Sequence, residues 1–378
     1  MKNEIIKELI ESNCIKFGSF LLKNGEVSKY YYDMKNLISN PILLKKIGDE
    51  LYKSLNEFDI ICGIPYGALP IATYISTQYN KPLIYIRDKQ KEYGTQKMIE
   101  GEFKKADRCV IIDDVITSGK SLEEEIEKLK DKVTIVDIAV IINRQQNPQC
   151  SMNFKSLLCK NDITRYKLNS ICESKKSNLI FSADIPDYKK IIQILEIIGK
   201  YIVACKIHLD IIDNSDEFIP KLIDLSIKHN FLIMEDRKFN DISYIVNMQY
   251  KKFRNWVDLV TVHSLVSNDV LSILSGALLV ANMSNNTYNF TEKAVEMAKQ
   301  QKDNVIGFIT QHRINCDNMV CMTPGISNNN SKIDDQKYRT TNEVDTDYII
   351  VGRALYNCNK DDIENKVKEL IPFISNYK

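Results

Sequence analysis

Histidine, tryptophan and net charge are all scarce in this chain of 378 residues. It contains four histidines and one tryptophan, and its 51 basic and 50 acidic residues leave a net charge of +1. So few histidines argue against a histidine-based metal cluster, and so small a charge gives no basis for binding nucleic acid or an acidic membrane. No apolar run approaches the roughly 20 residues that a membrane-spanning helix needs, and residues 3–12 read as an amphipathic helix, not a signal peptide. We therefore expect neither nucleic acid nor a membrane as a partner.

The cysteines are dispersed and lack the spacing of a metal site. Most of the ten lie inside apolar strands, as Cys62, Cys109 and Cys205 do, and the closest pair, Cys316 and Cys321, has no second pair to complete a zinc site. This pattern indicates buried thiols in a reducing compartment, so we expect a cytoplasmic protein. We also expect no metal ion held directly by side chains.

The length predicts two domains, each able to bury its own core. A hydrophobic content of 44% and a charged content of 27% are typical of globular proteins. Strands and helices alternate through both halves, which indicates an α/β fold class. No linker rich in Pro, Gly or Ser separates the halves, so we place the domains at 1–165 and 170–378, with the boundary within 150–178.

A phosphate-binding turn is the strongest chemical signal of the first half. An apolar strand at 109–114 ends in Asp113 and Asp114, and the turn at 117–119 then opens a helix at 121–130. Backbone N–H groups at a helix start can wrap a phosphate together with hydroxyl side chains, and the acids would face the hydroxyls of an attached sugar. A Walker A loop is excluded because Asp114 occupies the place of its first glycine. A simple helix cap would explain one acid but not two.

This stretch resembles the phosphoribosyl-pyrophosphate motif of type I phosphoribosyltransferases. From Phe17 to Arg144 the chain is similar to orotate phosphoribosyltransferase in particular, which implies a mainly parallel sheet flanked by helices and Mg²⁺ bound with phosphoribosyl pyrophosphate. The resemblance implies that orotate contacts Lys23, Thr117 and Arg144, that Tyr31 and Tyr32 line the base pocket, and that pyrophosphate meets Arg87, Lys91 and Tyr93 across a dimer interface. The remaining substrate-binding set is Asp113, Asp114, Ser118, Gly119, Lys120 and Ser121.

Two features of this half leave alternatives open. The tyrosine run 30–32 read alone fits a strand whose alternate rings pack in a core. Asp88 stands where the family usually has lysine, with Lys89 next to it. An acid facing pyrophosphate is repulsive, so either Lys89 substitutes or the affinity is weakened.

In the second half, apolar stretches recur every 15–30 residues, a spacing that is typical of the strands of a (β/α)₈ barrel. Expected strands lie at 179–181, 202–205, 231–234, 259–262, 277–281, 305–309, 319–322 and 348–351. Polar residues follow these strands, at the end where barrel active sites form. Asp236 and Lys238 point the same way on an extended chain, Lys206 ends the preceding strand, and Asp241 follows just beyond. A solvated charge run is the usual alternative, and the second lysine disfavours it.

Residues 178–356 look like orotidine 5′-monophosphate decarboxylase. The resemblance implies a catalytic array of Lys206, Asp236, Lys238 and, from a partner subunit, Asp241. It also implies ribose binding by Asp184 and His208, base binding by Ser284 and Gln336, and phosphate binding by Gln336, Tyr338 and Arg353. Further substrate-binding residues are Ser182, Ile242, Pro324 and Gly352. No cofactor is expected for this half, because a fixed ammonium can stabilise the carbanion left by CO₂ and then protonate it.

The chain departs from the decarboxylase pattern in two places. Ile245 replaces a threonine that would bind ribose across the dimer, and the segment before Leu179 looks short, without the usual entry element.

Together the resemblances are those of the bifunctional UMP synthases. Orotate and phosphoribosyl pyrophosphate would give orotidine 5′-monophosphate and pyrophosphate, and decarboxylation would give UMP, with a homodimer expected. The alternatives are a decarboxylase with a weakened transferase half, and a non-catalytic nucleotide sensor. Against the sensor, a binding protein has no need of Lys238.

Overall fold

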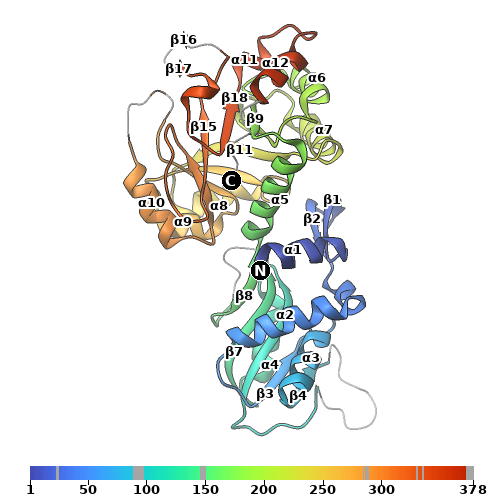
Figure 1. Cartoon of the computed structure of the whole chain (residues 1–378). Helices are drawn as coiled ribbons and strands as arrows, with labels where there is room; N and C mark the ends of the chain where they lie inside the picture. The colour runs from blue at the N-terminus through green and yellow to red at the C-terminus, as the bar shows by residue number, and fades with distance from the viewer. Residues whose placement is uncertain are drawn as a thin grey trace. The chain divides into compact units, whose positions relative to one another are not determined.

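The computed structural model describes residues 1–22, 25–87, 98–144, 150–283, 285, 289–328 and 336–371, and the backbone of 331–333 (Figure 1). For residues 336 and 337 it also gives the backbone alone. Contacts divide the chain into two units. The first combines Met1–Lys16 with Tyr30–Ile163, and the second combines Phe17–Lys29 with Thr164–Lys378. Each unit is an α/β structure, as the sequence predicts.

A six-stranded sheet forms the first unit, in the order β5-β4-β3-β6-β7-β8. All neighbours are parallel except the antiparallel pair β4 and β5. The strands are β3 (Ile60–Gly63), β4 (Leu83–Ile86), β5 (Ile99–Glu100), β6 (Arg108–Ile116), β7 (Thr134–Asn143) and β8 (Lys155–Cys159). The helices are α1 (Lys2–Glu11), α2 (Pro41–Ser54), α3 (Leu69–Tyr79) and α4 (Lys120–Leu129), with the 3₁₀ helix η1 (Met34–Ser39).

The helices of this unit follow from local sequence signals. Asn40 caps α2, because its side chain accepts a hydrogen bond from Leu43 N at 3.1 Å, and Pro41 suits the first helical position. On α4, Leu122, Ile126 and Leu129 recur at helical spacing and are buried. Burial of such a stripe against the sheet fixes the start of α4, and that start carries the Thr117–Gly119 turn.

The second unit contains a closed barrel of eight parallel strands, in the order β9-β10-β11-β12-β13-β14-β15-β18. These are β9 (Leu179–Ser182), β10 (Ala204–Ile207), β11 (Leu232–Phe239), β12 (Leu259–His263), β13 (Ala277–Val280), β14 (Val305–Ile309), β15 (Val320–Pro324) and β18 (Tyr348–Val351). Helices α5 (Lys160–Lys175), α6 (Tyr188–Ile198), α7 (Ser215–Lys228), α8 (Ser243–Lys251), α9 (Asn268–Ile273), α10 (Thr291–Gln300), α11 (Arg353–Tyr356) and α12 (Ile363–Leu370) accompany it. Short elements are η2 (Leu209–Ile211), η3 (Thr341–Glu343) and the antiparallel pair β16 (Ser331–Ile333) and β17 (Gln336–Tyr338).

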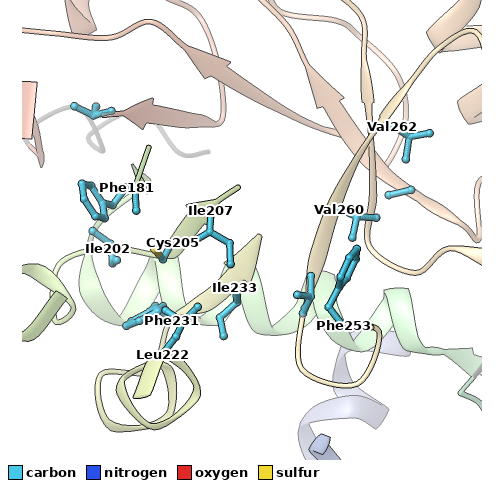
Figure 2. Close-up of a cluster of buried hydrophobic side chains, with 14 of the residues drawn as sticks. Phe181, Ile202, Cys205, Ile207, Leu222, Phe231, Ile233, Phe253, Val260 and Val262 are labelled. Carbon is cyan, nitrogen blue, oxygen red and sulfur yellow. The ribbon is translucent and has the colours of Figure 1, made fainter. Parts of the chain in front are cut away.

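The two faces of the barrel strands bury different clusters. Figure 2 shows the outer cluster, in which strand residues such as Phe181, Cys205 and Val260 pack with helix residues such as Leu222. Alternate residues, such as Ile180 and Met234, belong to a separate cluster inside the barrel. Side chains of Ser182, Lys206 and Asp236 share the inward parity, so the strand period itself turns them toward the barrel mouth.

Helix α5 precedes the first barrel strand and packs on the interior cluster of the barrel. Leu168, Ile171 and Cys172 are buried in the same cluster as the barrel interior. The expected helix at 163–173 is therefore present and extends over 160–175. The segment before Leu179, which looks short from the sequence, thus consists of one helix that directly follows β8.

A segment from the N-terminal hairpin also belongs to the barrel unit. Strands β1 (Ile15–Leu21) and β2 (Val27–Tyr32) pair with each other, and residues 17–29 group with the barrel. Lys29 Nζ lies 2.5 Å from Asp258 Oδ2, and the two side chains are 2% and 0% exposed. Asp258 Oδ2 also accepts a hydrogen bond from Ile233 N at 2.7 Å. Burial, together with the nearby Lys29, lowers the pKa of Lys167 to about 8, and its ammonium lies 4.2 Å from the ring centre of Phe17.

Within the described ranges, no helix is both long and apolar enough to cross a membrane.

Candidate active sites

A cavity of about 310 Å³ lies at the carboxyl ends of the barrel strands. Ten of the residues predicted for the decarboxylase site line it, namely Ser182, Asp184, Lys206, His208, Asp236, Lys238, Pro324, Tyr338, Gly352 and Arg353. They come from β9, β10, β11, β15, β17 and β18 and the loops that follow, as expected for a barrel whose functional face is the carboxyl end.

Charges alternate along one wall of this cavity. Lys206 Nζ lies 3.1 Å from Asp184 Oδ1 and 2.7 Å from Asp236 Oδ2. Lys238 Nζ lies 2.9 Å from the other oxygen of Asp236, Oδ1. The row therefore runs Asp184, Lys206, Asp236, Lys238, and each charge has a neighbour of opposite sign.

The electrostatics keep the two buried members of this row, Lys206 and Asp236, ionised. Burial would raise the pKa of Asp236, but the ammonium groups of Lys206 and Lys238 outweigh it and hold that pKa well below its usual range. Burial would likewise lower the pKa of Lys206, and the carboxylates of Asp236 and Asp184 instead hold it above its usual value. Burial and the nearby Lys206 lower the pKa of His208, which favours the neutral imidazole. Lys206 Nζ is 3.2 Å from Nε2 of that ring, so Nε2 suits the acceptor role.

The backbone turns sharply at Lys238. Its φ is +50°, and the pairing of β11 with β12 shifts register between Glu235 and Phe239. Lys238 N donates to Thr261 Oγ1 at 2.9 Å, and Thr261 Oγ1 donates to Asp236 Oδ1 at 2.7 Å. The sequence prediction of an extended run from Asp236 to Lys238 holds for the direction of the side chains but misses this turn.

The cavity also has a group of lining residues that suits an anion. Pro324, Gly325, Gly352 and Arg353 line it, together with Tyr338. Gly325 has φ +81°, a conformation that favours glycine, and its carbonyl accepts from Arg339 N at 3.0 Å. The guanidinium of Arg353 and the hydroxyl of Tyr338 are groups that bind phosphate.

Several predicted residues do not join this cavity. Asp241 and Ile242 are exposed, Ile242 at 66%, and among the described residues neither lines the cavity in this chain. Ser284 lies outside the described residues, and Gln336 is described only by its backbone in β17. Three apolar residues that follow Asp241 in the chain, Ile242, Tyr244 and Met248, are also exposed.

The second group of predicted residues lies at a switch point of the six-stranded sheet. The chain runs outward from β3 to β4 on one side and from β6 to β7 on the other, and ligands of open α/β sheets bind in such crevices. Asp113 and Asp114 lie in β6 at its carboxyl end, followed by the Thr117–Gly119 turn, where Gly119 has φ +81°. Gly67, from the loop after β3, lies so close to Asp114 that an added Cβ would be 1.7 Å from Oδ2. The two loops therefore meet at the acids.

Asp113 is a poorly solvated acid. Burial, with the adjacent charge of Asp114, raises the pKa of Asp113 to about 7, and Asp113 Oδ1 accepts from Asp114 N at 2.8 Å. Ser118 Oγ accepts from Lys120 N at 3.4 Å, while Lys120 itself is exposed. Hydroxyls, backbone N–H groups and a carboxylate pair are thus available together for a sugar phosphate.

The other transferase residues are partly described. Arg87 ends β4 and pairs with Glu100 at 2.5 Å. The guanidinium of Arg144 lies 5.8 Å from the ring centre of Tyr32, while Tyr31 is 42% exposed and Tyr30 is buried. The core interpretation of the tyrosines therefore applies to Tyr30. Lys23, Asp88, Lys89, Lys91 and Tyr93 lie outside the described residues.

Comparison with known proteins connects both sites to families. A profile of the orotidine 5′-phosphate decarboxylase / HUMPS family matches residues 177–369, and a phosphoribosyl transferase domain profile matches 33–165. An orotate phosphoribosyltransferase from Pyrococcus abyssi is 43% identical over 39% of this chain and 83% of its own length. The chain belongs to the orotidine 5′-phosphate decarboxylase / HUMPS family and, in its N-terminal half, to the orotate phosphoribosyltransferases.

Relatives of these families match each part and the whole. A decarboxylase from Pichia kudriavzevii, named orotidine 5′-phosphate decarboxylase, is 39% identical over 52% of this chain and 87% of its own length. A uridine 5′-monophosphate synthase from Bos taurus is 29% identical over 93% of this chain and 92% of its own length. The decarboxylase and transferase families are therefore joined here in the same order as in a full-length relative.

Sequence reasoning missed several residues of the decarboxylase cavity. Asn282, Met283, Ile309, Ile350 and Tyr356 also line it. Asn282 and Met283 directly follow β13, and the strand-end argument could have found them. Tyr356 ends the short helix α11 and enters the lining from there, a position for which the sequence carries no signal.

Proposed function

We propose that this chain is a bifunctional enzyme that makes UMP in two steps. Its N-terminal half transfers a phosphoribosyl group from phosphoribosyl pyrophosphate to orotate, and its C-terminal barrel decarboxylates the resulting orotidine 5′-monophosphate. The observation that carries the proposal is the alternating row of Asp184, Lys206, Asp236 and Lys238 at the wall of a cavity that Tyr338 and Arg353 also line. The domains we propose for the two steps are 1–165 and 170–378.

In the decarboxylation, the bond from C6 of the pyrimidine to its carboxylate breaks and leaves an electron pair on C6. The ammonium of Lys238 can stabilise this charge and then deliver its proton to C6. Asp236 holds Lys238 from one oxygen and Lys206 from the other, so the ammonium needs little reorganisation during the reaction. Asp184 and His208 suit the ribose, while Tyr338 and Arg353 suit the phosphate, whose binding can help organise the transition state.

In the transfer, a bond forms between the orotate ring nitrogen and C1 of the ribose, and the bond to pyrophosphate breaks. The Thr117–Gly119 turn and Ser121 suit the 5′-phosphate, and Asp113 and Asp114 suit the ribose hydroxyls. Arg144 lies beside Tyr32, where a flat carboxylated ring could contact both. Arg87 suits the leaving pyrophosphate, at the end of β4.

Magnesium fits the transferase site as a companion of pyrophosphate. Within the described residues no group of three or more acidic, histidine or cysteine side chains could hold a metal ion. A Mg²⁺ ion prefers oxygen ligands and often takes them from substrate phosphates, with one or two carboxylates. Here the substrate phosphates and water would be its ligands, in line with the expectation that no side chain holds a metal ion directly, and the bound ion would offset the charge of the leaving pyrophosphate.

We also propose a homodimer in which Asp241 completes the partner's catalytic row. Asp241 is exposed, and so are the apolar side chains of Ile242, Tyr244 and Met248 that follow it in the chain, which suits a protein interface. Coexpressed Asp241→Asn and Lys238→Ala chains, each inactive alone, should regain up to about a quarter of the wild-type decarboxylase activity, because half the dimers then contain one intact site. No regained activity in confirmed mixed dimers would refute the sharing.

The cytoplasm is the compartment we propose, since all ten cysteines are free thiols.

One assay with wild-type protein tests the function against its alternatives. Orotate, phosphoribosyl pyrophosphate and Mg²⁺ are supplied, and loss of orotate and appearance of UMP are followed separately. We expect both. Turnover of added orotidine 5′-monophosphate without any use of orotate would indicate a decarboxylase with a weakened transferase half, and turnover of neither would indicate a sensor.

A further inference from the structure

We propose that Thr261 is a positioning residue for decarboxylation, fixing Asp236 and the backbone of Lys238 through one hydroxyl group. This inference rests on the decarboxylase half of the proposed function. Thr261 lies in β12, its residue is 0% exposed, and it touches both members of the catalytic pair.

The directions of the two hydrogen bonds follow from chemistry. Asp236 is held ionised by its lysine neighbours, so its Oδ1 can only accept, and the Thr261 hydroxyl must donate to it at 2.7 Å. The N–H of Lys238 can only donate, so the same hydroxyl oxygen accepts from it at 2.9 Å. The single Thr261 hydroxyl therefore donates to Asp236 and accepts from Lys238 at the same time. Rotating the hydroxyl away from this orientation would break at least one of the two hydrogen bonds.

This bridge holds an unusual backbone conformation. Lys238 has a φ of +50°, a conformation that residues other than Gly, Asn and Asp seldom adopt. The register shift between Glu235 and Phe239 lies at the same place, so the ladder between β11 and β12 is interrupted there. The Lys238 N–H bonds to the Thr261 side chain, and the turn brings Lys238 Nζ back to 2.9 Å from Asp236 Oδ1.

The bridge also fixes the carboxylate plane. Asp236 Oδ1 accepts a hydrogen bond from the Thr261 hydroxyl and contacts the Lys238 ammonium, and Oδ2 accepts a hydrogen bond from the Lys206 ammonium. Loss of the hydroxyl would leave Lys206 and Lys238 to set the rotation of the carboxylate by themselves. Because misplacement of a catalytic group by about 1 Å can cost roughly a hundredfold in rate, a small rotation here should appear in kcat.

Thr261→Val is the test, because valine has nearly the shape of threonine and lacks the hydroxyl. Thr261→Ser restores the hydroxyl without the methyl group. Thr323→Val is the matched control, since Thr323 is a fully buried threonine on another barrel strand, β15, and its hydroxyl has no hydrogen-bond partner within the described part of the chain. For each full-length protein, kcat and KM for orotidine 5′-monophosphate, the Kd for UMP by calorimetry and the thermal unfolding midpoint are measured.

We expect Thr261→Val to lower kcat by roughly 10- to 100-fold while KM and the UMP Kd change less than about threefold, because phosphate and ribose contacts lie elsewhere. Thr261→Ser should recover most of kcat, and Thr323→Val should keep it. The inference is overturned if Thr261→Val retains wild-type kcat, if kcat and UMP affinity fall together, or if Thr261→Ser fails to rescue. A wild-type protein that does not decarboxylate would instead overturn the proposed function itself.

Discussion

The barrel unit contains two lysine–aspartate pairs that look alike in isolation and differ in their surroundings. At the carboxyl end, Lys206 and Asp236 are 2.7 Å apart and line a cavity. At the amino end, just before β12, Asp258 meets Lys29 at 2.5 Å, with both side chains at most 2% exposed. We call them the catalytic pair and the sealed pair.

The difference between the pairs lies in what else each carboxylate holds. Asp236 of the catalytic pair also holds Lys238, which is 29% exposed and faces the cavity, so one ammonium is available to a ligand. Asp258 of the sealed pair also accepts a hydrogen bond from the backbone N–H of Ile233, and its charge acts on the buried Lys167, but neither of these residues lines the cavity. A buried lysine–aspartate contact is therefore no evidence of chemistry by itself. A second ammonium held at a cavity wall is the feature that matters.

The largest effect should come from Lys238→Ala, which removes that second ammonium. We expect CO₂ release to fall by roughly 10³-fold or more, since the charge that develops at C6 loses its stabilising group. Orotate consumption should continue, and the unfolding midpoint should stay close to that of the wild type. Release of ¹⁴CO₂ and loss of orotate absorbance measure the two steps. A folded variant that loses both activities would contradict the assignment of separate sites.

The next largest effect should come from Lys29→Met. This substitution should lower the free energy of unfolding by breaking the sealed pair, and it should leave the catalytic pair unchanged. It removes the ammonium that lies 2.5 Å from the buried carboxylate of Asp258, and breaking a buried ion pair by removing one partner costs about 3–5 kcal/mol. Urea unfolding measures the free energy, and kcat for decarboxylation should stay near the wild-type value in the fraction that remains folded. The double variant Lys29→Met/Asp258→Asn should recover part of the stability. Equal stability of Lys29→Met and wild type would show that residues 17–29 are not anchored to the barrel.

The catalytic pair was predictable from the sequence, and the sealed pair was not. Lys206, Asp236 and Lys238 each follow an apolar stretch at a strand end, and the period of two fixes their direction. The expected strands at 305–309 and 348–351 are confirmed to the residue. Lys29 and Asp258 are 229 positions apart, and each sits in a stretch whose local pattern gives no sign of the other.

Other features were out of reach because their cause is tertiary. Strand β5 has two residues and so carries no period, and it forms because Ile99 and Glu100 pair with β4. The turn at Lys238 depends on Thr261, which arrives from the next strand. Thr261 does share the inward parity of β12, so the strand pattern placed it in the barrel interior without indicating its two partners. Tertiary contacts decided these positions, and propensity did not.

A smaller effect should come from Lys167, the buried lysine near the sealed pair, which should make the free energy of unfolding depend on pH. Burial and Lys29 lower the pKa of Lys167 to about 8, below its unfolded value, so between these two pKa values the folded state binds fewer protons than the unfolded state. The free energy of unfolding should therefore rise with pH, by up to about 1.4 kcal/mol per unit between roughly pH 8 and 10.5, relative to Lys167→Met. Urea unfolding of both proteins across this range measures the difference. Parallel pH curves would contradict the buried, depressed ammonium.

The smallest effect should come from Ile245→Thr, which tests whether the catalytic site is completed by a second chain. The sealed pair is complete within one chain, whereas we propose that the catalytic row is completed across a dimer, close to where Ile245 lies in α8. A threonine there adds a hydroxyl that can bond the ribose of the partner's ligand, and one such neutral bond contributes about 0.5–1.5 kcal/mol. KM for orotidine 5′-monophosphate should thus fall by less than about tenfold, with kcat almost unchanged. Asn247→Thr is the control, because Asn247 lies two residues further along α8 and is exposed. This control should leave KM unaltered. If Ile245→Thr leaves KM unaltered too, in a preparation shown by sedimentation to be dimeric, then this helix start does not face the partner's ribose.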